Sequence, residues 1–294
     1  MKPNRTDHAF PANTPQLQPF TVMSIWRDMT KASPALAWTG LLLVLWSCVT
    51  ALLPLVDSRL FQGVSVWLKP WKFQFSVGTY LLTLAFFLVW LPVLPQRSWA
   101  RRFVVWAGVA GGLFEVLYIT WQGALGQASH FNLTTPLYAT LYTLMAIGAI
   151  LLNTTSGVLG YCVLRSRDWS ASRSMRHAIG WGLLLTSVLG TITGFYLGGR
   201  ATTVGHWVGG SATDAGGLAI FHWSRDGGDL RVAHFFAIHA MHFLPLFGWD
   251  LQRLRPQSPS QSWRTYSVWA AAVLLCALCV LTFRQALRGQ PFLG

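Results

Sequence analysis

The stretch GDLRVAHFFAIHAMHFLPLFGWD, residues 228–250, decides the fold that we expect for the whole chain. It is long and apolar enough to cross a membrane, since a transmembrane helix needs about 20 predominantly apolar residues. The same stretch carries three histidines, His234, His239 and His242. Ionisable side chains inside a hydrocarbon layer usually face a partner, a cavity or a bound ion. We therefore expect the other spans to supply groups that meet these histidines.

The composition is typical of a membrane protein. Hydrophobic residues make up 53% of the chain, charged residues make up only 11%, and 16 residues are tryptophan. Further apolar runs of sufficient length occur along the chain, so the sequence predicts an all-α bundle of seven transmembrane helices. The predicted spans are residues 34–55, 71–93, 103–125, 136–164, 179–197, 231–249 and 266–287.

The segments outside the spans predict a topology. Residues 1–33 are polar, and we expect a mobile cytoplasmic tail ahead of a transmembrane domain at 34–290. With seven spans, 14 of the 22 Lys and Arg residues fall on one side of the membrane. Basic loops stay in the cytoplasm, which places the N-terminus inside and the C-terminus outside. Because these residues are dispersed among loops, they favour contact with the lipid bilayer and give no case for nucleic-acid binding.

Glu115, the only glutamate in the chain, lies near the middle of the third predicted span. Helical geometry puts it on the same face as Gly108 and Gly112, a pair of small residues that allows another helix to approach closely. The carboxyl group therefore points at protein. It is either a protonated group bonded to a neighbouring helix or a candidate catalytic group in a proton-relay, ion or cofactor site.

A glycine-rich connection on the outer side, residues 199–228, carries His206 and His222, each followed by a tryptophan. Long connections without evident secondary structure are often binding loops or lids. We expect either a loop that covers the site or a loose surface excursion. Asp229 follows it as a predicted N-cap of the sixth helix.

The depths of the candidate residues allow a shared site. A rise of about 1.5 Å per residue puts His239 and His242 roughly 12 and 16 Å below the outer start of their helix, and Glu115 about 15 Å below the outer end of its own. His239 and His242 are candidate ligands for Fe, Cu or Zn, together with Glu115 or with a loop histidine, His206 or His222. Any of His234, His239 and His242 is also a candidate ligand for haem b.

Other interpretations of the histidines stay open. The spacing H-x4-H-x2-H is not a specific metal signature. The apolar interiors of the other spans contain no histidine, which weakens a haem site with ligands on facing helices. The three histidines are alternatively bonded to one another, to Asn153 or to the backbone, or they belong to a proton-coupled transport pathway or a quinone pocket.

The segment GGDLRVAHFFAIHAMHFLPL, residues 227–246, contains the pattern GDLR-x-x-HF-x-x-x-HA. This pattern resembles one found in uncharacterised bacterial multi-pass membrane proteins. The resemblance implies a location in the bacterial inner membrane and implies no activity.

Together these features lead to a hypothesis about function. A polar site in the outer half of the bundle, built from Glu115, His239 and His242, is expected to bind haem or a transition metal for membrane electron transfer. The alternatives are a proton-coupled small-molecule transporter or channel and a non-catalytic accessory subunit with membrane-protein partners. The sequence alone does not decide whether the protein is an enzyme.

Overall fold

The computed structural model describes residues 21–89, 97–166, 172–200, 205–254 and 262–293, and these residues are mostly helical. The short strands pair in two antiparallel ladders, β1 (Leu60–Phe61) with β2 (Val64–Ser65) and β3 (Trp207–Val208) with β4 (Gly228–Asp229). The helices are α1 (Val22–Ala32), α2 (Pro34–Thr50), the short 3-10 helix η1 (Leu53–Leu55), α3 (Leu68–Val89), α4 (Trp99–Ala124), α5 (Pro136–Arg165), α6 (Arg173–Gly198), α7 (Leu230–Ile238), α8 (Ala240–Leu254) and α9 (Ser262–Leu287).

The long helices form a multi-pass membrane bundle. Six continuous segments within the described ranges are long and apolar enough to span a bilayer: α2 extended through η1, and α3, α4, α5, α6 and α9. Helices α7 and α8 together supply a seventh span, bent by 51° at their junction. The runs predicted from the sequence correspond to these spans. The orientation in the membrane stays a prediction.

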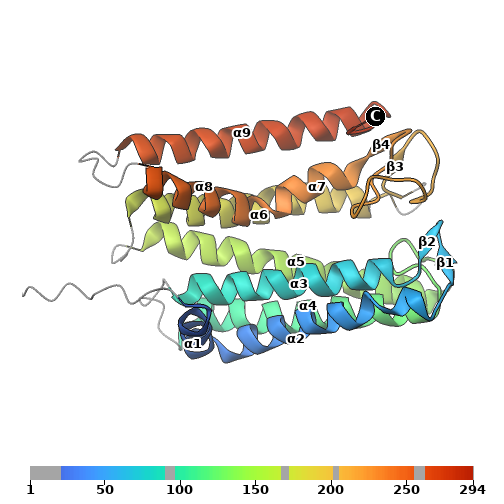
Figure 1. The fold of residues 1–294 in the computed structure, drawn as a ribbon, viewed down its shortest axis with the longest axis horizontal. Coiled ribbons are helices and arrows are strands. Elements are labelled where there is room, and N and C mark those ends of the chain that lie inside the picture. Colours follow the sequence, from blue (N-terminus) through green and yellow to red (C-terminus); the bar gives the residue numbers. More distant parts are fainter. Residues whose placement is uncertain (1–20, 90–96, 167–171, 201–204, 255–261, 294) are drawn as a thin grey trace, which may run out of the picture.

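The bundle has two distinct ends (Figure 1). Helices α2 to α9 run along its long axis, and all four strands lie at one end, which we call the loop end. Helix α1 lies across the opposite end and is seen nearly end-on. The bundle consists of two groups of helices, α2–α5 and α6–α9, and the groups meet where α5 packs against α6. Their backbones approach closely, because a Cβ added to Gly160 would come 2.9 Å from the carbonyl oxygen of Gly180.

Helix α1 differs from the tail that we expected over residues 1–33. Thr21 caps the helix by accepting a hydrogen bond from the Ser24 backbone N–H at 3.1 Å. Met29 is buried against the bundle, and Trp26 meets Trp38 edge-on with 5.0 Å between ring centroids. Residues 22–32 are therefore an ordered amphipathic helix, and residues 1–20 lie outside the described part of the chain.

The sixth predicted span, residues 231–249, is not a continuous helix, and the structure corrects that prediction. The break falls at His239, which caps α7. The Thr186 hydroxyl of α6 enters the break, donating a hydrogen bond to the carbonyl oxygen of Ile238 at 3.1 Å and accepting one from the Met241 N–H at 2.9 Å. Pro245 lies four residues after Met241 and has no N–H to donate to the Met241 carbonyl group. The hydroxyl satisfies backbone groups that a bent helix leaves open, as a hydrocarbon environment requires.

The small residues of the spans meet partners that the sequence did not specify. Gly108 and Gly112 of α4 face Leu81 and Val77 of α3. The glycines of α6 instead make room for α7, since a Cβ added to Gly194 would lie 3.4 Å from the His234 ring. Close packing against α6 therefore sets the position of α7.

The Thr186 hydroxyl is expected to hold the break between α7 and α8. Thr186→Val keeps the shape of the side chain but leaves the Ile238 carbonyl and the Met241 N–H without a partner. We expect the variant to lose about 1–3 kcal/mol of stability, measured by thermal or denaturant unfolding in detergent. Thr186→Ser retains the hydroxyl and serves as the control. Equal stability of the two variants would show that the hydroxyl does not hold the break.

Candidate functional site

Two of the three membrane histidines form a hydrogen-bonded pair at the helix break. The Nδ1 atoms of His239 and His242 lie 3.2 Å apart. The Nε2 atom of His242 lies 3.1 Å from the hydroxyl oxygen of Thr83 on α3. His242 thus joins α8 to α3, across the two groups of helices. The sequence predicted that these histidines lie close together, and it did not identify Thr83 as their partner.

The neighbouring hydrogen bonds determine which ring nitrogens of this pair carry a proton. The Thr83 hydroxyl donates to the carbonyl oxygen of Thr79 at 2.8 Å, so its oxygen accepts from the Nε2–H of His242. A neutral His242 then accepts at Nδ1 from the Nδ1–H of His239. This leaves the Nε2 atom of a neutral His239 unprotonated, and within the described residues it makes no hydrogen bond. The pair therefore has one nitrogen that is open to a proton.

The structure does not bring Glu115 to this pair. Gly112 of α4 faces Val77, and Gly123 faces Pro70, so Glu115 lies level with the part of α3 between these two residues. The pair is level with Thr83, which is at least about 9 Å further along α3. Glu115 and the His239–His242 pair, which we expected to form a single site, thus lie at two different depths in the bundle.

His234 lies nearer to the loop end and has its own partner. Its Nδ1 atom lies 2.8 Å from the Thr193 hydroxyl of α6. Asn153, which we considered as a partner of the histidines, instead donates to the Ser187 carbonyl at 2.9 Å and to the Thr191 hydroxyl at 2.8 Å. The hydrogen bond of His234 and those of the His239–His242 pair are thus separate.

A polar face of α3 connects the loop end to the histidine pair. At about 100° per residue, its members fall within an arc of about 80°. Lys72 donates to the carbonyl oxygen of Phe221 at 2.9 Å, and Thr83 contacts His242, so these two residues meet the loop and α8. Ser76, between these contacts, remains exposed. We call this surface the polar face of α3, and it consists of Lys69, Lys72, Ser76, Tyr80 and Thr83.

Lys69 lies at the loop end of this polar face, and Glu115 lies on the neighbouring helix α4. The Lys69 side chain is accessible to solvent although protein surrounds it, whereas Glu115 is only 7% exposed. They interact electrostatically, yet among the described residues neither makes a hydrogen bond or an ion pair. The partner of the buried carboxyl group is therefore a cation at a distance, and the sequence pointed instead to the histidines.

Residues 205–228, the described part of the glycine-rich connection, cover the loop end. A covering loop was one of the two arrangements that we expected for this connection. Asp229 is the N-cap predicted for the sixth helix and accepts a hydrogen bond from the Arg231 N–H at 3.0 Å. Arg231 Nη2 lies 2.7 Å from Asp229 Oδ2 and 2.8 Å from Asp214 Oδ1. Gly228 allows the strand to lie on α9, because an added Cβ would come 1.9 Å from the Ala286 carbonyl oxygen.

His206 and His222 both meet Asp214 rather than the membrane histidines. His206 Nε2 lies 3.5 Å from the Asp214 carboxylate, and His222 Nδ1 lies 3.4 Å from its carbonyl oxygen. Burial by itself raises the pKa of Asp214, but the contact with His206 and the positive charge of Arg231 outweigh it and lower the pKa to about 2. Burial lowers the pKa of His206, so this imidazole is neutral at pH 7. The sequence hypothesis that these histidines complete a metal site with His239 and His242 does not match this arrangement.

His130 lies in the connection between α4 and α5, beside Phe73 of α3. Its ring packs on Phe73 at a centroid distance of 5.6 Å. Burial, assisted by the positive charge of Lys69, lowers its pKa well below the usual range. His130 also interacts electrostatically with His206 and His234.

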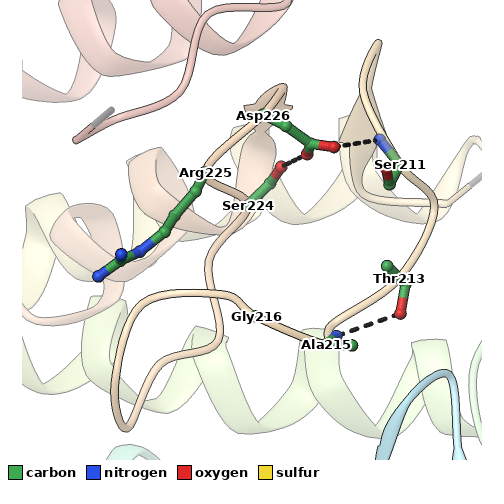
Figure 2. Close-up of a pocket in the computed structure, with 7 residues that line it drawn as sticks. All are labelled: Ser211, Thr213, Ala215, Gly216, Ser224, Arg225 and Asp226. Carbon is green, nitrogen blue, oxygen red and sulfur yellow. Dashed lines mark hydrogen bonds between the residues drawn. The ribbon is translucent and has the colours of Figure 1, made fainter.

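A cavity of about 220 Å³ lies within the loop itself, away from the membrane histidines (Figure 2). Asp226 organises it by accepting hydrogen bonds from the Ser224 hydroxyl at 2.8 Å and from the Ser211 N–H at 3.0 Å. Figure 2 shows the Arg225 side chain directed away from the other lining residues. The cavity is lined by Ser211, Thr213, Ala215, Gly216, Ser224, Arg225 and Asp226.

The arrangement of donors does not fit a transition-metal site built from several protein ligands. Within the described ranges, no three His, Cys, Asp or Glu side chains converge as such a site requires. His242 uses both ring nitrogens in hydrogen bonds, and His239 uses one. The pair can thus offer one free nitrogen, that of His239.

Lys69, Thr83 and Thr193 could not be predicted as site residues, because the partner of each lies on another helix. One signal was present. Polar residues recur at intervals of three or four along an otherwise apolar run from Lys69 to Thr83, which indicates a polar helical face.

The loop cover is expected to loosen in weak acid. The lowered pKa of His206 means that its neutral form stabilises the fold above pH 6.5 and that this contribution declines as the pH falls below 6.5. Asp214 also has a lowered pKa, so its ion pair with Arg231 persists until the pH falls through about 2. Amide hydrogen exchange of residues 205–229 should therefore be faster at about pH 5 than at about pH 8, after correction for intrinsic rates.

Two variants separate these contributions. His206→Gln should reduce the difference between the two pH values, whereas Asp214→Asn should accelerate exchange at both. An unchanged pH difference in His206→Gln would contradict the assignment to this imidazole.

No family model, curated protein or solved structure matches the chain. Its function has to be inferred from the geometry of the described residues.

Proposed function

We propose that the protein is a proton-coupled carrier of a small solute in the bacterial inner membrane, with its N-terminus in the cytoplasm. The observation that carries the proposal is the His239–His242 pair at the break between α7 and α8, bonded to Thr83 of α3. Discontinuous helices are a common feature of transporter binding sites, where the open backbone lines a protein-enclosed cavity.

The hydrogen bonds of the pair support a proton relay in which the proton passes from His239 to His242. An added proton binds the free Nε2 of His239. The Nδ1 proton of His239 can then pass to the Nδ1 of His242, 3.2 Å away. His242 would then carry protons on both nitrogens, while Thr83 still accepts from its Nε2–H. The net change is one added proton, shared by the pair at the contact between the two helix groups.

Protonation of the pair also has a mechanical consequence. A single added proton leaves a hydrogen bond between the two Nδ1 atoms, but a second one puts two N–H donors opposite each other and breaks it. Because α7 and α8 are already bent at His239, this contact is well placed to couple protonation to a change in the bend. Such coupling is what alternating access requires of a carrier.

Binding of haem b or of Fe, Cu or Zn for electron transfer is a second candidate, favoured by the free nitrogen of His239. It has less support, since one nitrogen supplies one ligand and the loop histidines lie elsewhere. An absorption spectrum and metal analysis of the purified protein, compared with His239→Ala, distinguish this candidate. A Soret band or a stoichiometric metal that the variant loses would replace the carrier proposal.

Proton movement tests the carrier directly. The protein is reconstituted in liposomes containing a pH-sensitive dye, a potassium diffusion potential is imposed, and internal pH is followed with and without a mixture of amino acids and small carboxylates outside. We expect solute-dependent acidification with the wild type and none above protein-free liposomes with His239→Ala. His177→Ala is the matched control, because this histidine contacts Trp269 of α9 instead. Equal flux in both variants, or no flux with the wild type, would refute the proposal.

A further inference from the structure

Helix α1 is held in a fixed position across the end of the bundle opposite the loop end (Figure 1). A single residue, Ser33, separates it from α2 and caps both helices. The Ser33 N–H donates to the Met29 carbonyl at 2.8 Å, and its hydroxyl accepts from the Leu36 N–H at 3.4 Å. The Arg101 guanidinium of α4 donates to the Ala32 carbonyl at the end of α1. Because α2 is long and apolar enough to span a bilayer from its first residue, α1 lies at the membrane boundary.

The two faces of α1 differ in character. Met29 is buried, and Ile25 and Trp26 pack against the core on the same side. Arg27 and Lys31 are four residues apart and therefore on one face of the helix, and both side chains are exposed. The apolar face of α1 is thus covered by the bundle, whereas its cations face outward.

The start of α4 adds a third exposed cation next to the end of α1. Arg101 brings these two helix ends together, and the next residue, Arg102, has an exposed side chain. Trp99 and Trp106, three residues before and four residues after Arg102, are 73% and 63% exposed and lie on the same face of α4. Exposed tryptophans of this kind are typical of the boundary between the hydrocarbon layer and the headgroups. Arg102 therefore lies at the level of the headgroups.

Carboxylates do not neutralise this surface. Within the described part of the chain, Arg27 Nε lies 3.8 Å from Asp28 Oδ1, and both side chains are largely in solvent, where an ion pair is worth little. No ion pair between described residues engages Lys31 or Arg102. The three cations outnumber the single aspartate, so the surface keeps a net positive charge.

We propose that α1 and the start of α4 bind anionic phospholipid headgroups, with Arg27, Lys31 and Arg102 facing the phosphates. A helix that lies along a membrane surface with a basic outer face attracts anionic lipids. The position of α1 at the start of a span, and the exposed tryptophans of α4, favour a lipid surface over a soluble partner. This binding surface is independent of the proposed transport function.

Lipid-dependent thermal stability in detergent tests the surface, because a ligand that binds the folded state raises the melting temperature. The probes are dioctanoyl phosphatidylglycerol, which is anionic, and dioctanoyl phosphatidylcholine, which has the same acyl chains and a zwitterionic headgroup. We expect phosphatidylglycerol to stabilise the wild type more, and about 0.5 M NaCl to reduce the difference by screening. Each cation near an anionic surface strengthens binding about fivefold. Lys31→Gln combined with Arg102→Gln should therefore require roughly 25-fold more phosphatidylglycerol for the same shift.

Arg225→Gln combined with Arg288→Gln is the matched control, since it removes two exposed cations away from α1. Each variant is first checked for an unchanged elution volume and a cooperative melt without added lipid. A preference for phosphatidylglycerol that the control keeps and the Lys31/Arg102 variant loses would support the proposal. Equal stabilisation of the wild type by the two lipids, or equal losses in the two double variants, would overturn it.

Discussion

The hydrogen bonds of the Thr186 hydroxyl across the break between α7 and α8 are the constraint on which the site depends. A bent helix leaves backbone groups open, and hydrocarbon offers no water to satisfy them. Thr186 donates to Ile238 and accepts from Met241, so the bend is held from α6. His239 and His242 meet through their Nδ1 atoms at this bend.

Polar groups in this bundle are gathered along one path. The covering loop holds Asp214 against Arg231 in a partly buried ion pair at the loop end. His130 and His234 follow, and the His239–His242 pair lies deepest, bonded to Thr83. The polar face of α3 runs from Lys69 to Thr83, which contacts His242. Titratable groups arranged in this way are suited to moving protons, and they are less suited to binding a metal through several ligands.

The comparison of expectation with structure is clearest for Glu115. Its position in an apolar run was sufficient to predict a buried carboxyl group that faces protein, and it is buried on α4. Its partner could not be predicted, because depth estimates along separate helices ignore how the helices are offset. The same estimates placed Glu115 level with His239 and His242, whereas the packing of Gly112 on Val77 places it nearer to the loop end.

The sequence by itself determined the class and the spans of this protein, because about 20 apolar residues are required to cross a bilayer wherever they occur. It also determined that three histidines and one glutamate lie within those spans and that Asp229 begins the sixth helix. Only the tertiary structure decided the break at His239, the bond to Thr83 and the pairing of Asp214 with Arg231. Each of these depends on a hydrogen bond or charge contact between different elements, and local periodicity carries no information about which elements become neighbours.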